Sequence, residues 1–302
     1  MDLTVILVNW NTHEMLRDCL ATVFAGQGAL TMEVIVVDNG STDESLAMLA
    51  AHFPQVGVIA NVTNRGFAAA NNQALSWARG RHVLLLNTDT LVRGDVLCAA
   101  VHWLDAHPKA AVLGPRVLNR DGTVQDSVKG WPGFGYLMRQ TLGLGRNRAP
   151  NLGLVAEAEV PAVSGCAMFV RRAALAEVGV LDEAFFFYGE ETDWCRRFAV
   201  AGWGVHFAPV GEIVHFGGGA ARRLDHRRDV MLTEGTVRLH RKHGGLAAGL
   251  ACYGLLLGFN ASRAVLWAGL ALARRPGARD RAQHFANVVA DYPRAWPQEG
   301  RA

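Results

Sequence analysis

The N-terminal third of the chain alternates short apolar runs with segments of helical spacing. The apolar runs occupy residues 3–8, 33–37, 56–60 and 81–86. The run Leu84-Leu85-Leu86 is apolar at every position, which is typical of a strand that is buried on both faces. Strands that alternate with helices in this way form parallel sheets covered by helices. The sequence therefore predicts an α/β fold with a largely parallel central sheet.

The remainder of the chain is less regular. Glycines are frequent over residues 115–160, and an apolar run at 160–170 then predicts a further strand. Residues 246–273 are mostly apolar, but they are rich in glycine and contain Arg263. A charged side chain in a short apolar stretch is unfavourable inside a bilayer. The stretch therefore favours a helix at a membrane surface, with packed core or dimer helices and a membrane span as the alternatives.

Charge is distributed unevenly along the sequence. Residues 1–220 contain 16 Lys and Arg against 21 Asp and Glu, whereas residues 221–302 contain 14 against 6. A basic C-terminal part indicates an anionic partner, either phosphate groups or an anionic membrane surface. The basic residues lie among long apolar stretches without a motif that reads bases, so we expect no nucleic-acid partner.

The cysteines and the start of the chain bear on its compartment. The five cysteines are scattered and form no CxxC pair, which predicts small core residues rather than a zinc site or disulfides. The first residues lack a basic segment ahead of an apolar one, so we expect no secretory signal and a cytoplasmic protein.

Polar residues follow several of the predicted strands. Asn9, Asp38 and Asp89 each stand at a strand end, and ligands on parallel sheets gather at the carboxyl ends of strands. Asp38 suits hydrogen bonds from a base or ribose, or it belongs to a helix-capping turn. The run Asn64-Arg65-Gly66-Phe67 begins a helix whose N–H groups face an anion, or it is an ordinary turn.

A possible metal site centres on Asp89 in the run Asn87-Thr88-Asp89. Mg²⁺ and Mn²⁺ often use one or two protein oxygens and take their other ligands from phosphate and water. His215, at a strand end before three glycines, either completes this site or makes a structural hydrogen bond. Arg222 and Arg223 either close over phosphates or form a solvated turn.

An acidic cluster forms the second candidate site. Glu190, Glu191 and Asp193 lie within four positions, and like charges so close raise one another's pKa. Such a cluster is suited to a general base with supporting neighbours, although acidic residues also favour helix N-termini. In a helix, Glu190 and Asp193 share a face and Glu191 points elsewhere. The aromatic residues that offer faces for a sugar ring are Phe187, Tyr188 and Trp194.

Taken in order, these segments resemble family 2 glycosyltransferases, the large inverting family with the GT-A fold. The similarity is greatest to the bacterial branch of cell-wall and O-antigen rhamnosyltransferases, and it covers about residues 3–220. The matching segments include Val5-Ile6-Leu7-Val8-Asn9-Trp10-Asn11, Val34-Ile35-Val36-Val37-Asp38-Asn39-Gly40-Ser41-Thr42-Asp43, Asn64-Arg65-Gly66-Phe67-Ala68, Leu84-Leu85-Leu86-Asn87-Thr88-Asp89, Ser164-Gly165-Cys166-Ala167-Met168-Phe169, Gly179-Val180-Leu181-Asp182-Glu183 and Tyr188-Gly189-Glu190-Glu191-Thr192-Asp193.

The resemblance implies a GT-A (Rossmann-like) fold, with a mostly parallel central sheet covered by helices and a C-terminal helical extension. It implies a nucleotide-sugar-binding half over residues 1–115 and an acceptor-binding, catalytic half over 116–240. Residues 241–302 then form an apolar helical region that associates with a membrane.

The resemblance also assigns roles to particular residues. Asn87-Thr88-Asp89 corresponds to the family's metal-binding acidic motif, with Asn87 where Asp is frequent, and this makes His215 more plausible as a second ligand. The family's Glu-Asp base motif corresponds to Glu190-Glu191, which favours Glu191 as the base, Glu190 as the alternative and Asp193 as a supporting group. The implied nucleotide-binding residues are Val8, Asn9, Asp38, Asn64, Gly66, Phe67, Asn71 and Asn87, and the implied acceptor-binding residues are Gly165, Phe187, Tyr188 and Trp194.

The implied reaction is a single displacement with inversion. A divalent cation, Mg²⁺ or Mn²⁺, holds the diphosphate of a nucleotide-sugar donor, and a carboxylate deprotonates the acceptor hydroxyl. Rhamnose from dTDP-rhamnose is the expected donor group, and a cell-envelope glycan or lipid-linked acceptor at the inner face of the membrane is expected to receive it. A non-catalytic glycan-assembly protein and a sugar nucleotidyltransferase are the rival interpretations, and the lack of GxGxxG after any strand disfavours a dehydrogenase.

Overall fold

A computed structural model of the chain describes residues 1–141, 156–217 and 225–298. The chain forms two compact units. Unit 1 comprises Met1–Trp131, Arg148–Phe186 and Glu190–Ala220, and unit 2 comprises Pro132–Asn147, Phe187–Gly189 and Ala221–Ala302. The expected three-part division of the chain stays a prediction, and Arg222 and Arg223 lie outside the described residues.

Unit 1 is built on a nine-stranded sheet whose main order is β3-β2-β1-β4-β10-β6-β11-β5, with β8 paired to β11. The first four strands in this order are parallel to one another, and β6 is parallel to β11. Strand β10 joins the two parallel groups in the antiparallel direction. The predicted α/β fold is confirmed. The main strands are β1 (Leu3–Asn9), β2 (Met32–Asn39), β3 (Gly57–Asn61), β4 (His82–Asn87), β5 (Thr90–Arg93), β6 (Ala110–Leu118), β10 (Ala167–Arg171) and β11 (Gly204–His215).

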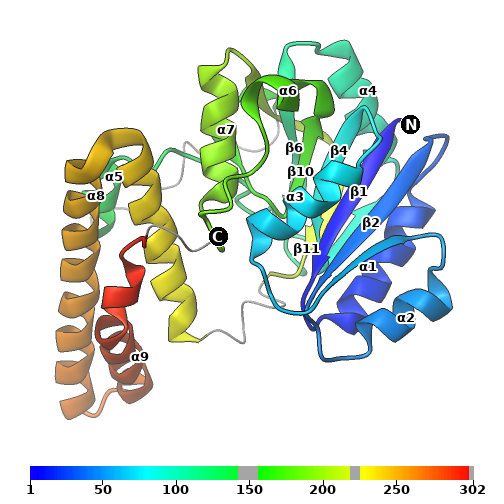
Figure 1. The fold of residues 1–302 in the computed structure, drawn as a ribbon. Coiled ribbons are helices and arrows are strands. Elements are labelled where there is room, and N and C mark those ends of the chain that lie inside the picture. Colours follow the sequence, from blue (N-terminus) through cyan, green and yellow to red (C-terminus); the bar gives the residue numbers. More distant parts are fainter. Residues whose placement is uncertain (142–155, 218–224, 299–302) are drawn as a thin grey trace. The chain divides into compact units, whose positions relative to one another are not determined.

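Helices cover both faces of this sheet (Figure 1) because successive strand residues point to opposite sides. In β1, Val5 and Leu7 belong to the core beneath α1, α2 and α4, whereas Ile6 belongs to the core beneath α3 and α7. Four of the five cysteines are buried and all are free thiols, as expected. The helices of unit 1 are α1 (His13–Ala25), α2 (Ser45–His52), α3 (Phe67–Trp77), α4 (Val96–Ala106), α6 (Leu175–Val178) and α7 (Glu190–Val200).

The single strand predicted over residues 160–170 is wrong. The chain forms three short strands there: β8 (Ala158–Glu159), β9 (Ala162–Val163) and β10. Pro161 has no N–H for a ladder, which separates β8 from β9. Strand β9 instead pairs with β7 (Val128–Lys129) outside the main sheet. This small ladder fixes the backbone of Lys129.

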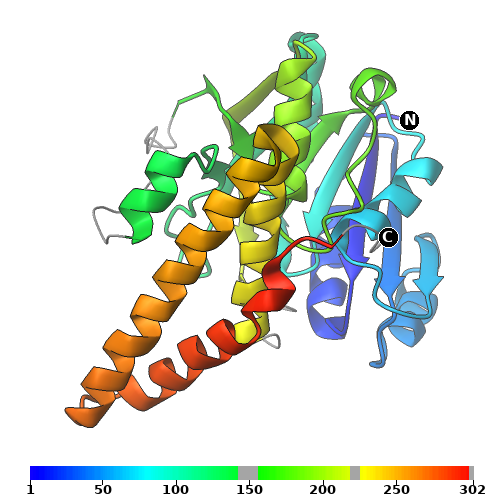
Figure 2. The same ribbon diagram turned by 60° about the vertical axis from the view of Figure 1, so that its left-hand side comes forward.

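Unit 2 consists of α5 (Phe134–Thr141), α8 (His226–Leu272), α9 (Ala278–Ala290) and a short 3₁₀ helix (Figure 2). The chain turns sharply within α8 at Gly245, whose φ of 79° favours glycine. The turn brings Gly249 against Arg241. Two small cores hold the helices together, and their buried members are Leu137, Val237 and Cys252 in one and Val230, Val288 and Ala295 in the other.

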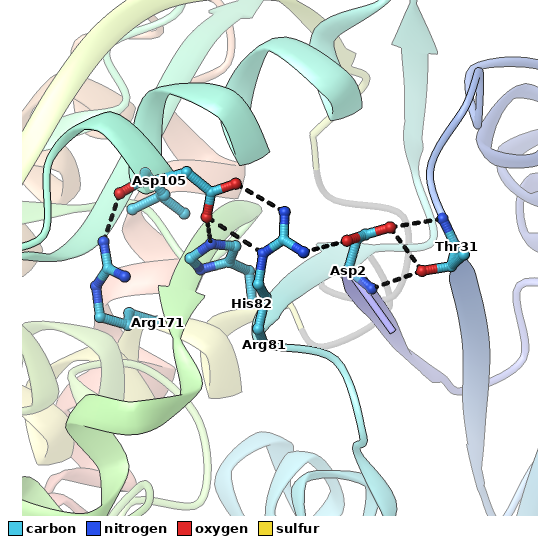
Figure 3. Close-up of polar contacts among 7 residues, drawn as sticks. Asp2, Thr31, Arg81, His82, Asp105 and Arg171 are labelled. Carbon is cyan, nitrogen blue, oxygen red and sulfur yellow. Dashed lines mark hydrogen bonds and ion pairs between the residues drawn. The ribbon is translucent and has the colours of Figure 1, made fainter.

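A polar network ties down the amino-terminal ends of β1 and β4 (Figure 3). Asp105, at the end of α4, accepts hydrogen bonds from Arg81 at 2.7 and 3.2 Å and lies 2.8 Å from the His82 ring. Asp2 accepts bonds from Thr31 and pairs with Arg81, and the Thr31 bonds lower the pKa of Asp2 to about 2. These ends lie opposite the strand ends that carry the predicted site, so the network has a structural role.

Candidate active site

The carboxyl ends of β1, β2 and β4 bring four predicted nucleotide-binding residues together. Asn9 lies in register with Asp38, and Val8 lies in register with Asn87. The buried Asn9 amide donates to Asp38 Oδ2 at 2.8 Å and to Ser41 Oγ at 3.1 Å. The Ser41 N–H donates to Asp38 Oδ1 at 3.0 Å. The pattern of polar strand ends therefore gathers these side chains at one edge.

The turn before α3 is held by amide side chains rather than left open. Asn64 Oδ1 accepts hydrogen bonds from the Gly66 N–H and from Asn39, both at 2.9 Å. The Phe67 N–H donates to the Phe186 carbonyl oxygen at 2.8 Å, so this N–H does not face an anion as we expected. Gly66 has a φ of 84°, and a Cβ there would lie 2.5 Å from the same oxygen.

Asn71 lies in the second turn of α3 and is buried. Its side-chain amide donates to the Phe67 carbonyl at 2.8 Å within the same helix. Its predicted contact with a nucleotide stays a prediction.

Asp89 and His215 meet at the predicted metal position. Strand β5, which begins directly after Asp89, pairs with β11, and His215 lies in register with Thr90. His215 Nε2 lies 3.3 Å from Asp89 Oδ1. The Asp89 carbonyl also accepts the Phe216 N–H at 2.9 Å, which fixes the backbone at this corner. The sequence placed the two residues at strand ends, and only the β5–β11 pairing brings them into contact.

Gln125, which the sequence did not single out, orients the His215 ring. Gln125 Oε1 lies 2.7 Å from His215 Nδ1, and Gln125 Nε2 donates to Asn119 Oδ1 at 2.9 Å. With the amide oriented in this way, Gln125 Oε1 accepts from Nδ1–H, and Nε2 is directed at Asp89. Metal-ligating histidines commonly donate their other ring N–H to such a partner, which fixes the orientation of the ring.

This donor set suits a cation that is shared with phosphate. Asp89 is buried, and the described ranges contain no group of three or more His, Cys, Asp or Glu arranged around a metal position. One carboxylate and one imidazole leave most of an octahedral shell to be filled by phosphate oxygens and water. The pair fits Mg²⁺ or Mn²⁺ bound together with a diphosphate.

The acidic cluster begins α7 and is buried throughout. Glu190, Glu191 and Asp193 expose 5%, 4% and 0% of their surfaces. Arg197 donates to Asp193 Oδ2 at 2.8 Å and to two backbone carbonyls, those of Val178 and Val180. Asp193 therefore anchors α7 to the preceding loop.

Glu190 and Glu191, rather than Glu190 and Asp193, form the interacting pair. Burial, followed by the charge of Glu191, raises the pKa of Glu190 well above its ordinary value of 4.5. We expected Glu190 and Asp193 to lie on one face of the helix, and the structure shows that the Asp193 carboxylate is engaged by Arg197.

Lys129 forms an ion pair with Glu191. Sequence reasoning missed it because a single lysine in a loop-like stretch carries no periodic or motif signal. Its position comes from the β7–β9 ladder, which pairs Lys129 with Ala162.

Cys166 links the two halves of the site. Its carbonyl accepts the Asn87 N–H at 3.0 Å. Burial raises the pKa of the Cys166 thiol, and the charges of Lys129, Asp89 and Glu191 all act on it. A Cβ on the adjacent Gly165 would lie 3.7 Å from both Glu191 Cβ and the Phe67 ring. Gly165 therefore lies beside the glutamate pair.

The predicted aromatic acceptor residues are divided by the fold. Trp194 is fully buried, donates its indole N–H to the Gly179 carbonyl at 3.0 Å and packs against Phe198. Its ring has no face open to a sugar, so its predicted role as an acceptor contact is wrong. Phe187 and Tyr188 are half-buried residues of unit 2 whose rings lie 4.2 Å apart.

Sequence comparison identifies the class of enzyme to which this site belongs. The family model described as "Glycosyl transferase family 2" matches residues 4–179. The chain therefore belongs to glycosyl transferase family 2, and it is a glycosyltransferase, as the resemblance implied.

Among its relatives, the chain is similar to an N-acetylglucosaminyl-diphospho-decaprenol L-rhamnosyltransferase of Mycobacterium tuberculosis, with 28% identity over 204 residues. This match covers 61% of the chain and 66% of the relative, slightly less than two thirds of that protein. Rhamnosyltransferase WbbL of Escherichia coli (strain K12) is 23% identical, with coverage of 60% of the chain and 72% of the relative.

Solved structures share the fold at low identity. The mannosyltransferase PcManGT from Pyrobaculum calidifontis, solved in complex with GDP-Man and Mn²⁺, has a TM-score of 0.59 and 21% identity over 98% of the chain and 88% of its own. S. aureus TarS 1–349 has a TM-score of 0.54 and 19% identity over 97% of the chain and 91% of its own.

Proposed function

We propose that this enzyme transfers rhamnose from dTDP-rhamnose to a hydroxyl of a cell-envelope glycan or lipid-linked acceptor. The main support for this proposal is the arrangement around Cys166, directly before β10. Asp89 of the Asp89–His215 pair and Glu191 of the Glu190–Glu191 pair both act on its thiol. The rhamnosyltransferase relatives support the choice of sugar. The name of the Mycobacterium tuberculosis relative, which includes diphospho-decaprenol, supports a lipid-linked acceptor.

A divalent cation, Mg²⁺ or Mn²⁺, is the proposed cofactor. Asp89 and His215 would hold it, and His215 presents Nε2 because Gln125 accepts from Nδ1. Such a cation neutralises the charge that develops on a diphosphate leaving group. The PcManGT neighbour was solved with Mn²⁺, which supports this proposal.

The protein's own groups would perform the remaining steps. Asp38 and Asn9 would bind the nucleoside at the edge of the sheet. Glu191 would accept the proton of the acceptor hydroxyl while its oxygen attacks the anomeric carbon. The bond from this carbon to the diphosphate breaks on the opposite face, so the configuration inverts. Gly165, which lies beside Glu191, remains a proposed acceptor contact, as do Phe187 and Tyr188.

A thermal-shift panel tests this function. We expect a dTDP-containing ligand to raise the melting temperature in the presence of Mn²⁺. At 100 times its Kd, a bound ligand adds about 2.7 kcal/mol to the free energy of unfolding. GDP-, UDP- and CMP-containing ligands at the same concentration serve as the controls for the base. A larger shift with another nucleotide would reject dTDP-rhamnose, and no shift with any nucleotide would favour the non-catalytic assembly protein.

We also propose that unit 2 binds the surface of an anionic membrane. Helix α8 is long and apolar enough to cross a membrane by length and composition, and only 6% of its most apolar window is buried within the protein. Arg274 and Arg275 at its end are exposed, and cations near an anionic leaflet each contribute about 1 kcal/mol. The exposed apolar side chains of α8 are Leu246, Leu250, Val265, Leu266 and Leu272. The sharp turn at Gly245 and the central Arg263 favour surface attachment over a span.

Flotation with lipid vesicles tests the attachment. The protein is expected to bind phosphatidylglycerol vesicles, and Val265→Glu should weaken binding at least about tenfold because it places a charge on the apolar surface. Val200→Glu, at an 81% exposed position of unit 1, is the matched control and should bind normally. Equal binding by both variants would contradict the proposal. Retention in the membrane after alkaline carbonate extraction would instead indicate a span.

A further inference from the structure

Among the residues that the structure describes, a cation contacts the buried glutamate pair at the start of α7. Lys129 pairs with Glu191, whose side chain is 6% exposed. Glu190 is equally buried, and its Oε2 has no hydrogen-bond partner within the described parts of the chain. Two adjacent buried carboxylates repel one another, so ionising both at once is costly. The position of Lys129 therefore distinguishes two residues that are equivalent in sequence.

The other titratable groups around the pair do not change this balance. Cys166 faces it from the start of β10, and Cys195 lies one turn further along α7. Burial raises the pKa of both thiols, that of Cys195 to about 12, so both are neutral. Asp193 is paired with Arg197 on the same helix. Asp89, two residues after β4, acts on the thiol of Cys166 as a negative charge.

We propose that Lys129 is a positioning residue that keeps Glu191 ionised and leaves the shared proton of the pair on Glu190. This inference rests on the proposed function, and it assigns the base in that reaction. The acceptor O–H bond breaks and its proton goes to Glu191. The freed electron pair forms the bond to the anomeric carbon, and the bond to the diphosphate breaks with its electrons on the leaving group.

The direction of the pKa shifts agrees with this geometry. Burial is the largest single effect on Lys129 and acts to lower its pKa, but the charge and hydrogen bond of Glu191 together with the charge of Glu190 outweigh it and raise the pKa to about 12. Burial and the Glu191 charge raise the pKa of Glu190. A raised carboxyl pKa in the folded state contributes stability below pH 4.5 that is lost as the pH rises through the folded value. Without Lys129, the pKa of Glu191 would also be raised, and the folded state would lose further stability as the pH rises through that value.

Melting temperature as a function of pH tests the inference without any activity. Lys129→Gln should melt close to the wild type at pH 5, and the difference should grow by about 3–6 °C towards pH 8. Lys129→Arg preserves the charge and should follow the wild-type curve. A purely structural lysine predicts a constant offset across this pH range, and that result would overturn the proposal.

The kinetics of sugar transfer provide a second test of the inference. Lys129→Gln should lower kcat at least about tenfold, move the acidic limb of the kcat profile to higher pH by about one unit, and change the donor KM less than about threefold. Lys129→Arg should restore most of kcat. An unshifted acidic limb would reject the proposal. If the melting curves behave as expected but no sugar is transferred, the proposed function fails and the charge assignment stands.

Discussion

Replacing Glu191 by glutamine should lower kcat for sugar transfer by about 10²–10⁴-fold, the usual contribution of a general base. Glutamine retains the size of the side chain but does not accept a proton. The donor KM should stay within about threefold, because Glu191 borders the acceptor side of the site at Gly165 rather than the nucleotide residues at the β1–β2 edge. Release of nucleoside diphosphate, measured with saturating donor and acceptor, gives both constants.

A matched control for this variant is Glu14→Gln. Glu14 also lies in the first turn of a helix, but its side chain is 64% exposed and pairs with Arg17 and with the half-buried His13. This control should keep wild-type rates. Loss of the cooperative melting transition in Glu191→Gln would show misfolding. In that case Glu191→Asp, which keeps the charge, should retain more activity than Glu191→Ala. A rate for folded Glu191→Gln within threefold of the wild type would refute its role as the base.

Replacing Asp89 by asparagine should abolish the Mn²⁺-dependent part of the nucleotide thermal shift. The change removes the carboxylate of the Asp89–His215 pair and preserves its shape, so the cation loses its charged protein ligand. The rate of transfer should fall at least about 10²-fold, because the leaving diphosphate then lacks charge compensation. Thermal-shift titrations with nucleotide, run with Mn²⁺ and with EDTA, measure the metal-dependent part directly.

Asp95→Asn is the control for this prediction. Asp95 precedes α4, is exposed and makes no side-chain capping bond, so its replacement should leave the metal-dependent shift unchanged. His215→Gln should weaken the metal-dependent shift to a smaller extent, because it removes a neutral ligand. A full metal-dependent shift in Asp89→Asn would place the cation elsewhere and remove the support for this pair.

Much of the site was predictable because parallel strands place their carboxyl ends at one edge. Asn9, Asp38 and Asn87 follow strands whose apolar runs are visible in the sequence, and the register of β1 with β2 and β4 brings them together. His215 was harder to assign, since its contact with Asp89 depends on the distant pairing of β5 with β11. A strand-end histidine alone does not reveal its partner.

The errors arose where tertiary contacts override a local pattern. Trp194 follows the acidic cluster in sequence, yet helical geometry turns its ring into the core, where its N–H finds the Gly179 carbonyl. The apolar run at 160–170 reads as one strand, but Pro161 interrupts it and β9 leaves the main sheet. Hydrophobicity alone predicts neither outcome, because apolar side chains occupy strands and other core positions alike.

The sequence by itself determined the α/β fold, the family and the sheet edge that gathers the candidate site residues, because periodicity and strand-end residues are local signals. Only the tertiary structure decided which charges meet. The β7–β9 ladder sets Lys129 on Glu191, Gln125 orients His215, and Arg197 engages Asp193. The first two contacts join residues that are far apart in the sequence and that the fold brings close. Asp193 and Arg197 have ordinary helical spacing, but the tertiary structure holds the Arg197 guanidinium through the Val178 and Val180 carbonyls. Electrostatic effects depend on the distance and burial that such contacts create.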